Sequence, residues 1–272
     1  VTNNQFTLGS PLTTSAAALT KSGAGVLVLN GLTGNTYAGG TFFNQGLIEA
    51  SALGNLGSGN LNFFGGGLRW ATGATFDISA RTVLLGTGGA TFDTNGNNVA
   101  FANALGSGSG ALTKDGLGVL TLNATSTLTG GTNVNAGTLA LGVSGAIGTG
   151  ALSLANNGTL ALGAGTGAAN QTVSQLSGAS TGSIVGGDAA VSILTVNQST
   201  SSTFAGNLGG AGANQNNFGL TKTGVGSLTL SGTTLSYAGP TVVNGGTLNL
   251  TGSSGAVLAT SALTVARGAT LS

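Results

Sequence analysis

The sequence predicts an all-β fold of the solenoid class, in which each turn of one continuous coil stacks on the turn before it. The first observation is an internal repeat, because the stretch GTLALG at 137–142 returns at 158–163, after 21 positions. The second is alternation, since many short segments place apolar residues at every second position between glycine-containing turns. Like residues that return at a fixed step of about 20 positions are typical of coils whose turns stack as parallel strands.

The composition fits strands and turns. Glycine accounts for 53 of the 272 residues, and the charged residues are 6 Lys or Arg and 5 Asp or Glu. The hydrophobic content of 40% is enough for a core, but no apolar stripe with a period of about 3.6 residues is long enough to form a helix. Low charge and high glycine content also occur in disordered or silk-like chains, and the alternation argues against that class.

The expected strands follow one another along the whole chain. Those with the clearest alternation are 26–29, 120–122, 138–141, 152–154, 193–196, 228–230 and 263–265. Further echoes support the step, because 46–50 is echoed at 67–71 after 21 positions, whereas GATFD at 73–77 returns at 89–93 after 16. Rungs of about 21 residues predict about 13 rungs in a single solenoid over 1–272, and a rod on the order of 60 Å long.

A longer repeat, which contains several rungs, is also present. LTKSGAGVLVL at 19–29 returns as LTKDGLGVLTL at 112–122 and as LTKTGVGSLTL at 220–230. Each copy is followed by a second element, which reads YAGGTFFNQG at 37–46, TGGTNVNAGTL at 129–139 and YAGPTVVNGGTL at 237–248. Three modules therefore begin near 19, 112 and 220, within one continuous domain.

This two-part pattern resembles the passenger-associated β-strand repeat of bacterial autotransporters, over about 30 residues in each of the three copies. The resemblance implies a right-handed parallel β-helix that is exported to the surface of a Gram-negative-type bacterium or secreted from it. The family's C-terminal translocator has no counterpart here, and the sequence stops at Ser272 inside a strand pattern. We therefore expect a fragment, a processed passenger or a subunit with another export route.

Several function classes are disfavoured by the residues themselves. The formal net charge is +1 with scattered charges, so no basic stripe is available for nucleic acid. No run of about 18 apolar residues predicts a transmembrane helix. The chain has no Cys and no His, so zinc ligands and Ser or Cys triads cannot be assembled, and we expect no metal site and no cofactor.

Lys21, Lys114 and Lys222 occupy the same place in the three modules, at the end of a strand and just before a glycine turn. An ammonium group there can donate to several turn carbonyls while its stem packs on leucine. We interpret these lysines as structural, with ligand binding as the less favoured alternative.

Asp77 and Asp93 are the strongest candidates for catalysis. If the two GATFD motifs lie on neighbouring rungs, their carboxylates approach the separation of about 5 Å that retaining glycosidases use. However, no other acid lies close in the sequence, and each Asp falls at the exposed end of an expected strand. We therefore favour solvated turn residues and predict no enzymatic activity.

Two phenylalanine pairs predict a surface feature. Adjacent residues of a strand point to opposite faces, so one ring of each pair is expected in the core and the other outside. A bulge or loop that buries both rings is the alternative. The candidate aromatic patch comprises Phe42, Phe43, Phe63, Phe64 and Trp70.

The ends of a solenoid carry unpaired backbone groups, and neither end of this sequence offers an obvious cap. Pairing of one copy's last rung with the next copy's first rung is a contact that does not close, so it predicts a filament. The candidate self-association residues are Val1, Thr2, Phe6 and Leu8 at one end and Ala269, Thr270 and Leu271 at the other.

Two functions remain open at this point. The favoured one is a structural or adhesive extracellular rod, a filament subunit whose main partner is itself and whose further partners are host or matrix glycans. The alternative is a carbohydrate-binding or polysaccharide-cleaving β-helix, for which clustered acids beside an aromatic groove would be the mark.

Overall fold

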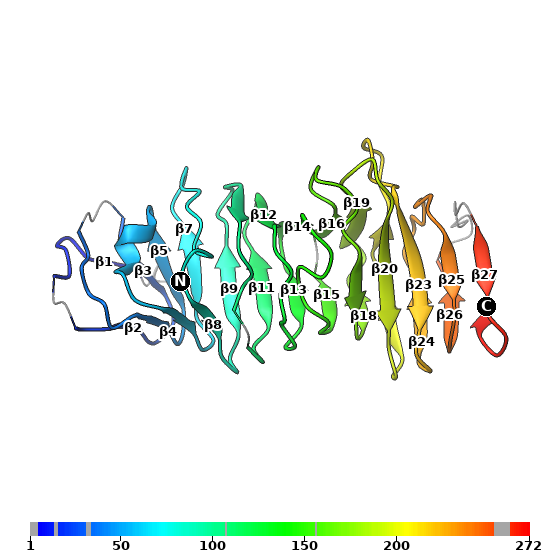
Figure 1. Ribbon diagram of the computed structural model, residues 1–272, viewed down its shortest axis with the longest axis horizontal. Coiled ribbons are helices and arrows are strands. Elements are labelled where there is room, and N and C mark those ends of the chain that lie inside the picture. The colour runs from blue at the N-terminus through cyan, green and yellow to red at the C-terminus, as the bar shows by residue number, and fades with distance from the viewer. Residues whose placement is uncertain (1–4, 14–15, 31–33, 107, 156, 253–261) are drawn as a thin grey trace.

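The computed structural model describes residues 5–13, 16–30, 34–106, 108–155, 157–252 and 262–272. The chain forms an elongated coil of short strands stacked along one axis (Figure 1). Neighbouring strands in each sheet are parallel throughout the described residues. The first such pair is β1 with β3, and the last is β26 with β28. The predicted parallel β-solenoid is confirmed.

One sheet runs the full length of the rod and receives one strand from each successive turn; we call it the long sheet. It has 13 strands, which are β1 (Gln5–Thr7), β3 (Val26–Val28), β5 (Leu47–Ala50), β7 (Gly67–Trp70), β9 (Ala90–Asp93), β11 (Leu112–Asp115), β13 (Thr132–Val134), β15 (Leu152–Leu154), β18 (Leu176–Gly178), β21 (Ser202–Phe204), β24 (Ser227–Leu230), β26 (Thr247–Leu250) and β28 (Thr270–Leu271).

Three shorter sheets complete the sides of the coil. The first short sheet contains β2 (Leu19–Lys21), β4 (Thr41–Phe43), β6 (Leu61–Phe63) and β8 (Val83–Leu85). The central sheet contains β10 (Val99–Phe101), β12 (Val119–Leu122), β14 (Gly137–Leu141), β16 (Gly158–Leu162), β19 (Ser183–Gly186) and β22 (Asn207–Leu208). The last short sheet contains β17 (Gln171–Val173), β20 (Ser192–Asn197), β23 (Phe218–Thr223), β25 (Thr241–Val243) and β27 (Leu263–Val265). One 3-10 turn, η1, spans Leu53–Leu56.

The second module is displaced by one side of the coil relative to the other two. Its LTK segment is β11 in the long sheet, whereas the LTK segments of the first and third modules are β2 and β23 in the short sheets. The strand after the turn shifts in the same way, because β3 and β24 belong to the long sheet and β12 to the central sheet. The central sheet therefore exists only around the second module and ends at β22.

The register confirms the main repeat and corrects two of the echoes. Leu139 pairs with Leu160, 21 residues on, but the step varies from 19, between Leu120 and Leu139, to 26, between Ser192 and Phe218. Leu47 pairs with Gly67 and not with Leu68, so the echo of 46–50 at 67–71 is one residue out of register, and Phe43 likewise pairs with Phe63 after 20 residues. The two GATFD stretches do not pair, because 73–77 lies outside the strands.

Stacked side chains fill the interior. One hydrophobic cluster runs along the rod, with leucine ladders such as Leu139 and Leu160, both fully buried. Near the start of the rod the core is aromatic, and the rings of Phe43 and Phe63 stack with their centroids 4.1 Å apart. Trp70 is also fully buried, and its Nε1 donates to the carbonyl of Phe76 at 3.0 Å.

The three equivalent lysines hold the module turns together. Nζ of Lys114 donates to the carbonyls of Asp115, Gly116 and Ala136 at 2.8, 2.7 and 3.1 Å. Lys222 makes the same three bonds in the third module, whereas Lys21 makes two. Lys114 and Lys222 are fully buried, and Lys21 is partly buried. The structural interpretation of these lysines agrees with this geometry, because each ammonium ties its own turn to the turn of the next rung.

A buried hydroxyl distinguishes the second module from the others. Tyr37 and Thr41 share a buried hydrogen bond of 2.9 Å, and Tyr237 and Thr241 share one of 2.7 Å. In the second module the tyrosine position is Leu128, and among the described residues nothing bonds Oγ1 of Thr132. An unpaired buried hydroxyl costs about 1–3 kcal/mol.

We therefore expect Thr132→Val to stabilise the fold by about 1 kcal/mol, since valine has the shape of threonine and removes the unpaired group. Thr241→Val is the matched control and should destabilise, because it leaves the Tyr237 hydroxyl buried without its partner. Denaturant midpoints with an unchanged slope measure both effects. A lower midpoint for Thr132→Val would contradict the expectation.

Candidate contact surfaces

The two aspartates considered for catalysis are not brought together. Asp77 lies between β7 and β8, and its two carboxylate oxygens accept from the backbone N–H groups of Ser79 and Ala102 at 2.6 and 2.9 Å. Asp93 is the last residue of β9 and accepts from the N–H of Asn95 at 2.9 Å. Both carboxylates cap turns, and the paired arrangement of a glycosidase is not formed by these two residues.

Asp93 belongs instead to a short ladder of charges on the outer face of the long sheet. Arg69 lies between Glu49 and Asp93 on neighbouring strands, with its Nε 3.4 Å from a Glu49 oxygen and 3.7 Å from an Asp93 oxygen. The Arg69 side chain is about one third exposed, so these ion pairs contribute little to stability. The ladder contains two acids and one cation, and Asp115 on the next strand pairs in register with Asp93.

The aromatic patch is smaller than the sequence indicates. Phe43, Phe63 and Trp70 are core residues, so only Phe42 and Phe64 of the five face outward. Their rings are stacked with centroids 6.5 Å apart and an interplanar angle of 7°. Leu84, which is 37% exposed, extends this surface over the first short sheet. We call Phe42, Phe64 and Leu84 the aromatic patch below.

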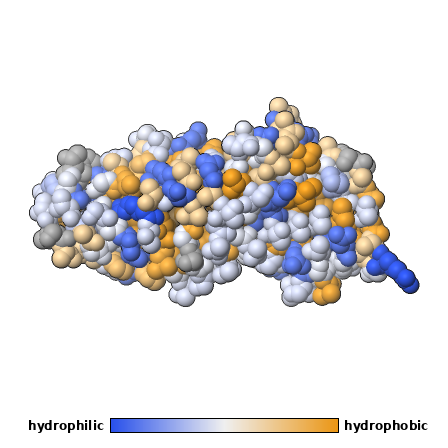
Figure 2. Space-filling view, in the orientation of Figure 1, coloured by the Kyte–Doolittle hydropathy of each residue, from blue (hydrophilic) through white to orange (hydrophobic). Residues whose placement is uncertain are grey.

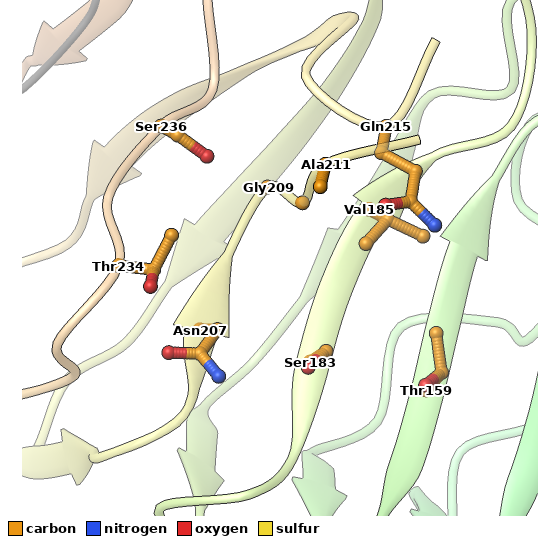
Figure 3. A pocket seen from close by; sticks show the side chains of 10 residues that line it. Thr159, Ser183, Val185, Asn207, Gly209, Ala211, Gln215, Thr234 and Ser236 are labelled. Carbon is orange, nitrogen blue, oxygen red and sulfur yellow. The ribbon is translucent and has the colours of Figure 1, made fainter. Parts of the chain in front are cut away.

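A second surface feature lies over the central sheet, where that sheet ends. It is an open trough of about 500 Å³. Its polar lining consists of Thr159, Ser183, Asn207, Gln215, Thr234 and Ser236. Figure 3 shows the first three on successive strands, with Thr234 and Ser236 on the segment beyond them. Nothing in the sequence distinguishes these residues, since Ser, Thr and Asn occur in nearly every rung.

The remaining lining residues form the apolar floor and one wall of the trough. Val185, on the floor, is only 7% exposed. The chain then turns at Gly209, whose φ of +99° favours glycine, and a Cβ there would lie 2.4 Å from the Ser236 hydroxyl. Gly210 and Ala211 continue into the loop that forms the wall. The trough thus depends on glycine at this corner.

The face of the molecule seen in Figure 2 is weakly polar. Figure 2 shows pale residues over most of the visible face, with hydrophilic and apolar residues in small groups. Within the described ranges, no three His, Cys, Asp or Glu side chains gather as metal ligands would. No helix in the described part of the chain is long and apolar enough to span a membrane.

The fold and these surfaces define a repetitive, nearly uncharged parallel β-solenoid with three modules. Those modules match the Passenger-associated-transport-repeat at residues 19–50, 112–141 and 220–250. The chain is also 35% identical over 167 residues to a protein called "Adhesin BmaC autotransporter" from Brucella suis biovar 1 (strain 1330). The chain therefore contains three copies of a repeat found in autotransporter passengers, and it is similar over part of its length to an autotransporter adhesin.

The similarity to the Brucella adhesin covers 61% of this chain but 5% of that relative's length. No solved structure matches the chain.

Proposed function

We propose that this chain is an adhesive and structural section of a bacterial surface β-solenoid. The observation that carries the proposal is the presence of three passenger repeat modules, which build one stiff rod with weakly polar sides. The name of the similar protein, an adhesin, supports the adhesive part. The aromatic patch is an exposed apolar surface on the side of the rod, and such surfaces often mark sites of protein contact.

Adhesion can be tested with the purified chain coupled to beads and allowed to settle on epithelial monolayers or on immobilised extracellular matrix. We expect beads with the chain to bind more than beads with albumin. Phe42→Ser together with Phe64→Ser should reduce binding if the aromatic patch makes the contact, whereas Val225→Ser is the control, since Val225 is 84% exposed in a turn elsewhere. Equal binding of chain and albumin would refute the adhesive function.

We propose further that the chain has no catalytic activity. Asp77 and Asp93 each cap a turn, so Asp77→Asn with Asp93→Asn should keep an acceptor oxygen at both turns and leave adhesion unchanged. The measurement is release of reducing ends from neutral and acidic polysaccharides. Cleavage by the native protein that disappears in the double variant would overturn this part of the proposal.

The finer form of the proposal is assembly of copies end to end. Val1 and Thr2 lie outside the described residues, but Phe6 on β1 is 66% exposed, and Leu263 and Val265 on β27 are 49% and 42% exposed. β1 and β28 are the two edge strands of the long sheet, and exposed edges can template further pairing.

Light scattering and negative-stain microscopy test this assembly. We expect particles of the native chain to lengthen with concentration, and Phe6→Lys or Thr270→Lys to suppress that growth, because a charge on an edge strand opposes pairing. A monodisperse monomer at high concentration would show that end-to-end assembly is wrong, without affecting the adhesive function.

A further inference from the structure

We propose that the trough over the central sheet binds one chain of neutral sugar residues along the axis of the rod, and holds it without cleaving it. This inference rests on the proposed adhesive function and names a ligand class for it.

Polar groups on the floor form a row along the rod. Thr159 pairs with Ser183, and Ser183 with Asn207, so the three side chains point outward from successive strands. Successive strands are about 4.8 Å apart, which is of the same order as the length of one pyranose ring in a chain. Hydroxyl and amide groups both donate and accept hydrogen bonds, as the hydroxyls of a sugar do.

A small apolar cluster lies beside this row. It consists of Ala140, Ala161 and Val185, each less than a tenth exposed, with Val119 and Ala164 packed against it. Of these, Val185 belongs to the lining of the trough. An apolar contact beside a few fixed polar groups is the usual composition of a small-molecule site.

The lining carries no charge among the described residues that form it. A charged ligand would give up hydration there without meeting an opposite charge, whereas a neutral hydroxylated ligand exchanges one set of neutral hydrogen bonds for another. The lining also lacks a carboxylate, so it has no general acid for cleavage of a glycosidic bond. The chemistry therefore favours binding of a neutral glycan and retention of it intact.

The wall of the trough is fixed before any ligand arrives. Oδ1 of Asn216 accepts from the N–H of Gly210 and from the hydroxyl of Ser236, both at 2.9 Å. Oε1 of Gln215 accepts from the N–H of Gly212 at 2.9 Å. Groups held in place in advance lose little freedom on binding, which favours affinity.

The end of the central sheet explains why the trough lies here. β22 is the last strand of that sheet, and its backbone pairing with the next turn is an isolated bridge between Leu208 and Leu235. Because the chain leaves the regular stack at this point, 209–217 can fold beside the floor and Thr234 and Ser236 can form the far side. The displacement of the second module thus creates a site that a uniform solenoid would lack.

In the experiment the whole chain is titrated with maltohexaose, cellohexaose and chitohexaose, and binding is measured by calorimetry and by amide NMR. We expect at least one neutral hexasaccharide to bind and to shift the signals of Ser183, Val185 and Asn207. Ser183→Ala with Asn207→Ala should weaken that binding about tenfold or more, as loss of two hydrogen bonds predicts. Thr138→Ala is the matched control, because Thr138 belongs to the same ladder but lies outside the trough.

Four results would overturn the inference. The first is that no neutral hexasaccharide shows saturable binding up to about 10 mM. The second and third are that a hyaluronan hexasaccharide or a Gly-Ser peptide binds more strongly than the neutral hexasaccharides. The fourth is that the double variant, with a native melting curve, keeps its affinity for the sugar. Bead adhesion distinguishes failure of the trough inference from failure of the adhesive function. If beads adhere but no sugar binds, the trough inference fails while the adhesive function stands. If sugars bind but beads do not adhere, the adhesive function fails while the trough remains a sugar site.

Discussion

Leu160→Asp is expected to disrupt the middle of the rod and to lower the free energy of unfolding by about 5 kcal/mol. Leu160 is fully buried in β16, between Leu139 on one side and Ile184 on the other. The substitution removes the leucine packing and places a carboxylate where no cation or donor is positioned for it, and an uncompensated buried charge costs several kcal/mol. Neighbouring rungs stabilise one another in a solenoid, so the damage should spread from that rung.

Thr159→Asp is the matched control for this substitution. Thr159 is adjacent in the same strand, but it is half-buried and faces the open trough, so an aspartate there stays hydrated. Circular dichroism melting and limited proteolysis distinguish the variants, with new cleavage near the middle of the chain expected for Leu160→Asp alone. A melting curve of Leu160→Asp like that of the native protein would contradict the inward leucine ladder.

The fold class, the stacking of Leu139 on Leu160 and the role of the module lysines could all be predicted from the sequence. The reason is that these features depend on local alternation and on a repeat, which are visible along the chain. Lys114 precedes a glycine turn, and the carbonyls that accept from it belong mostly to that turn. Local chemistry of this kind needs no knowledge of the rest of the fold.

Features that depend on the register between rungs, or on which side of the coil a strand falls, could not be predicted. The strand that contains Trp70 could face either way until its register with Ala50 is known, and the indicated step of 21 residues was one too long there. The displacement of the second module follows from loop lengths between strands, which vary freely in a solenoid. The trough leaves no mark on the sequence, because its residues come from four successive turns and are common throughout the chain.

The unpaired hydroxyl of Thr132 accompanies this displacement. The first and third modules place their Thr in the short sheets, on β4 and β25, and each hydroxyl is bonded to the Tyr four residues earlier. The second module puts the equivalent threonine in the long sheet, and Leu128 stands at its tyrosine position. A repeat can therefore keep its backbone pattern on a different side of the coil while its interior partners change.

The pH dependence of stability offers a separate measure of the lysine at the second module. Burial lowers the pKa of Lys114 to about 8 from an ordinary value of 10.5, against the opposing influence of Asp93 and Asp115. Between these two pH values the unfolded chain binds more protons than the folded one, so the free energy of unfolding should rise as the pH increases through this window. Lys21 and Lys222 are present in both the native protein and a Lys114 variant, so their contributions cancel in the comparison.

Lys114→Met is expected to destabilise the fold by about 3 kcal/mol at pH 7, because it removes three charge-assisted hydrogen bonds and leaves buried carbonyls without that donor. Loss of the buried charge offsets part of this cost, since the ammonium no longer has to be desolvated. Lys222→Met should behave alike, whereas Lys21→Met should cost less, because Lys21 is only partly buried and makes two bonds. Denaturant unfolding at pH 7 ranks the three variants by their loss of stability. Near pH 10 the difference in free energy of unfolding between the native protein and Lys114→Met should be larger than at pH 7. Equal effects at all three positions, or a stabilised Lys114→Met, would show that the lysines do not hold the turns together.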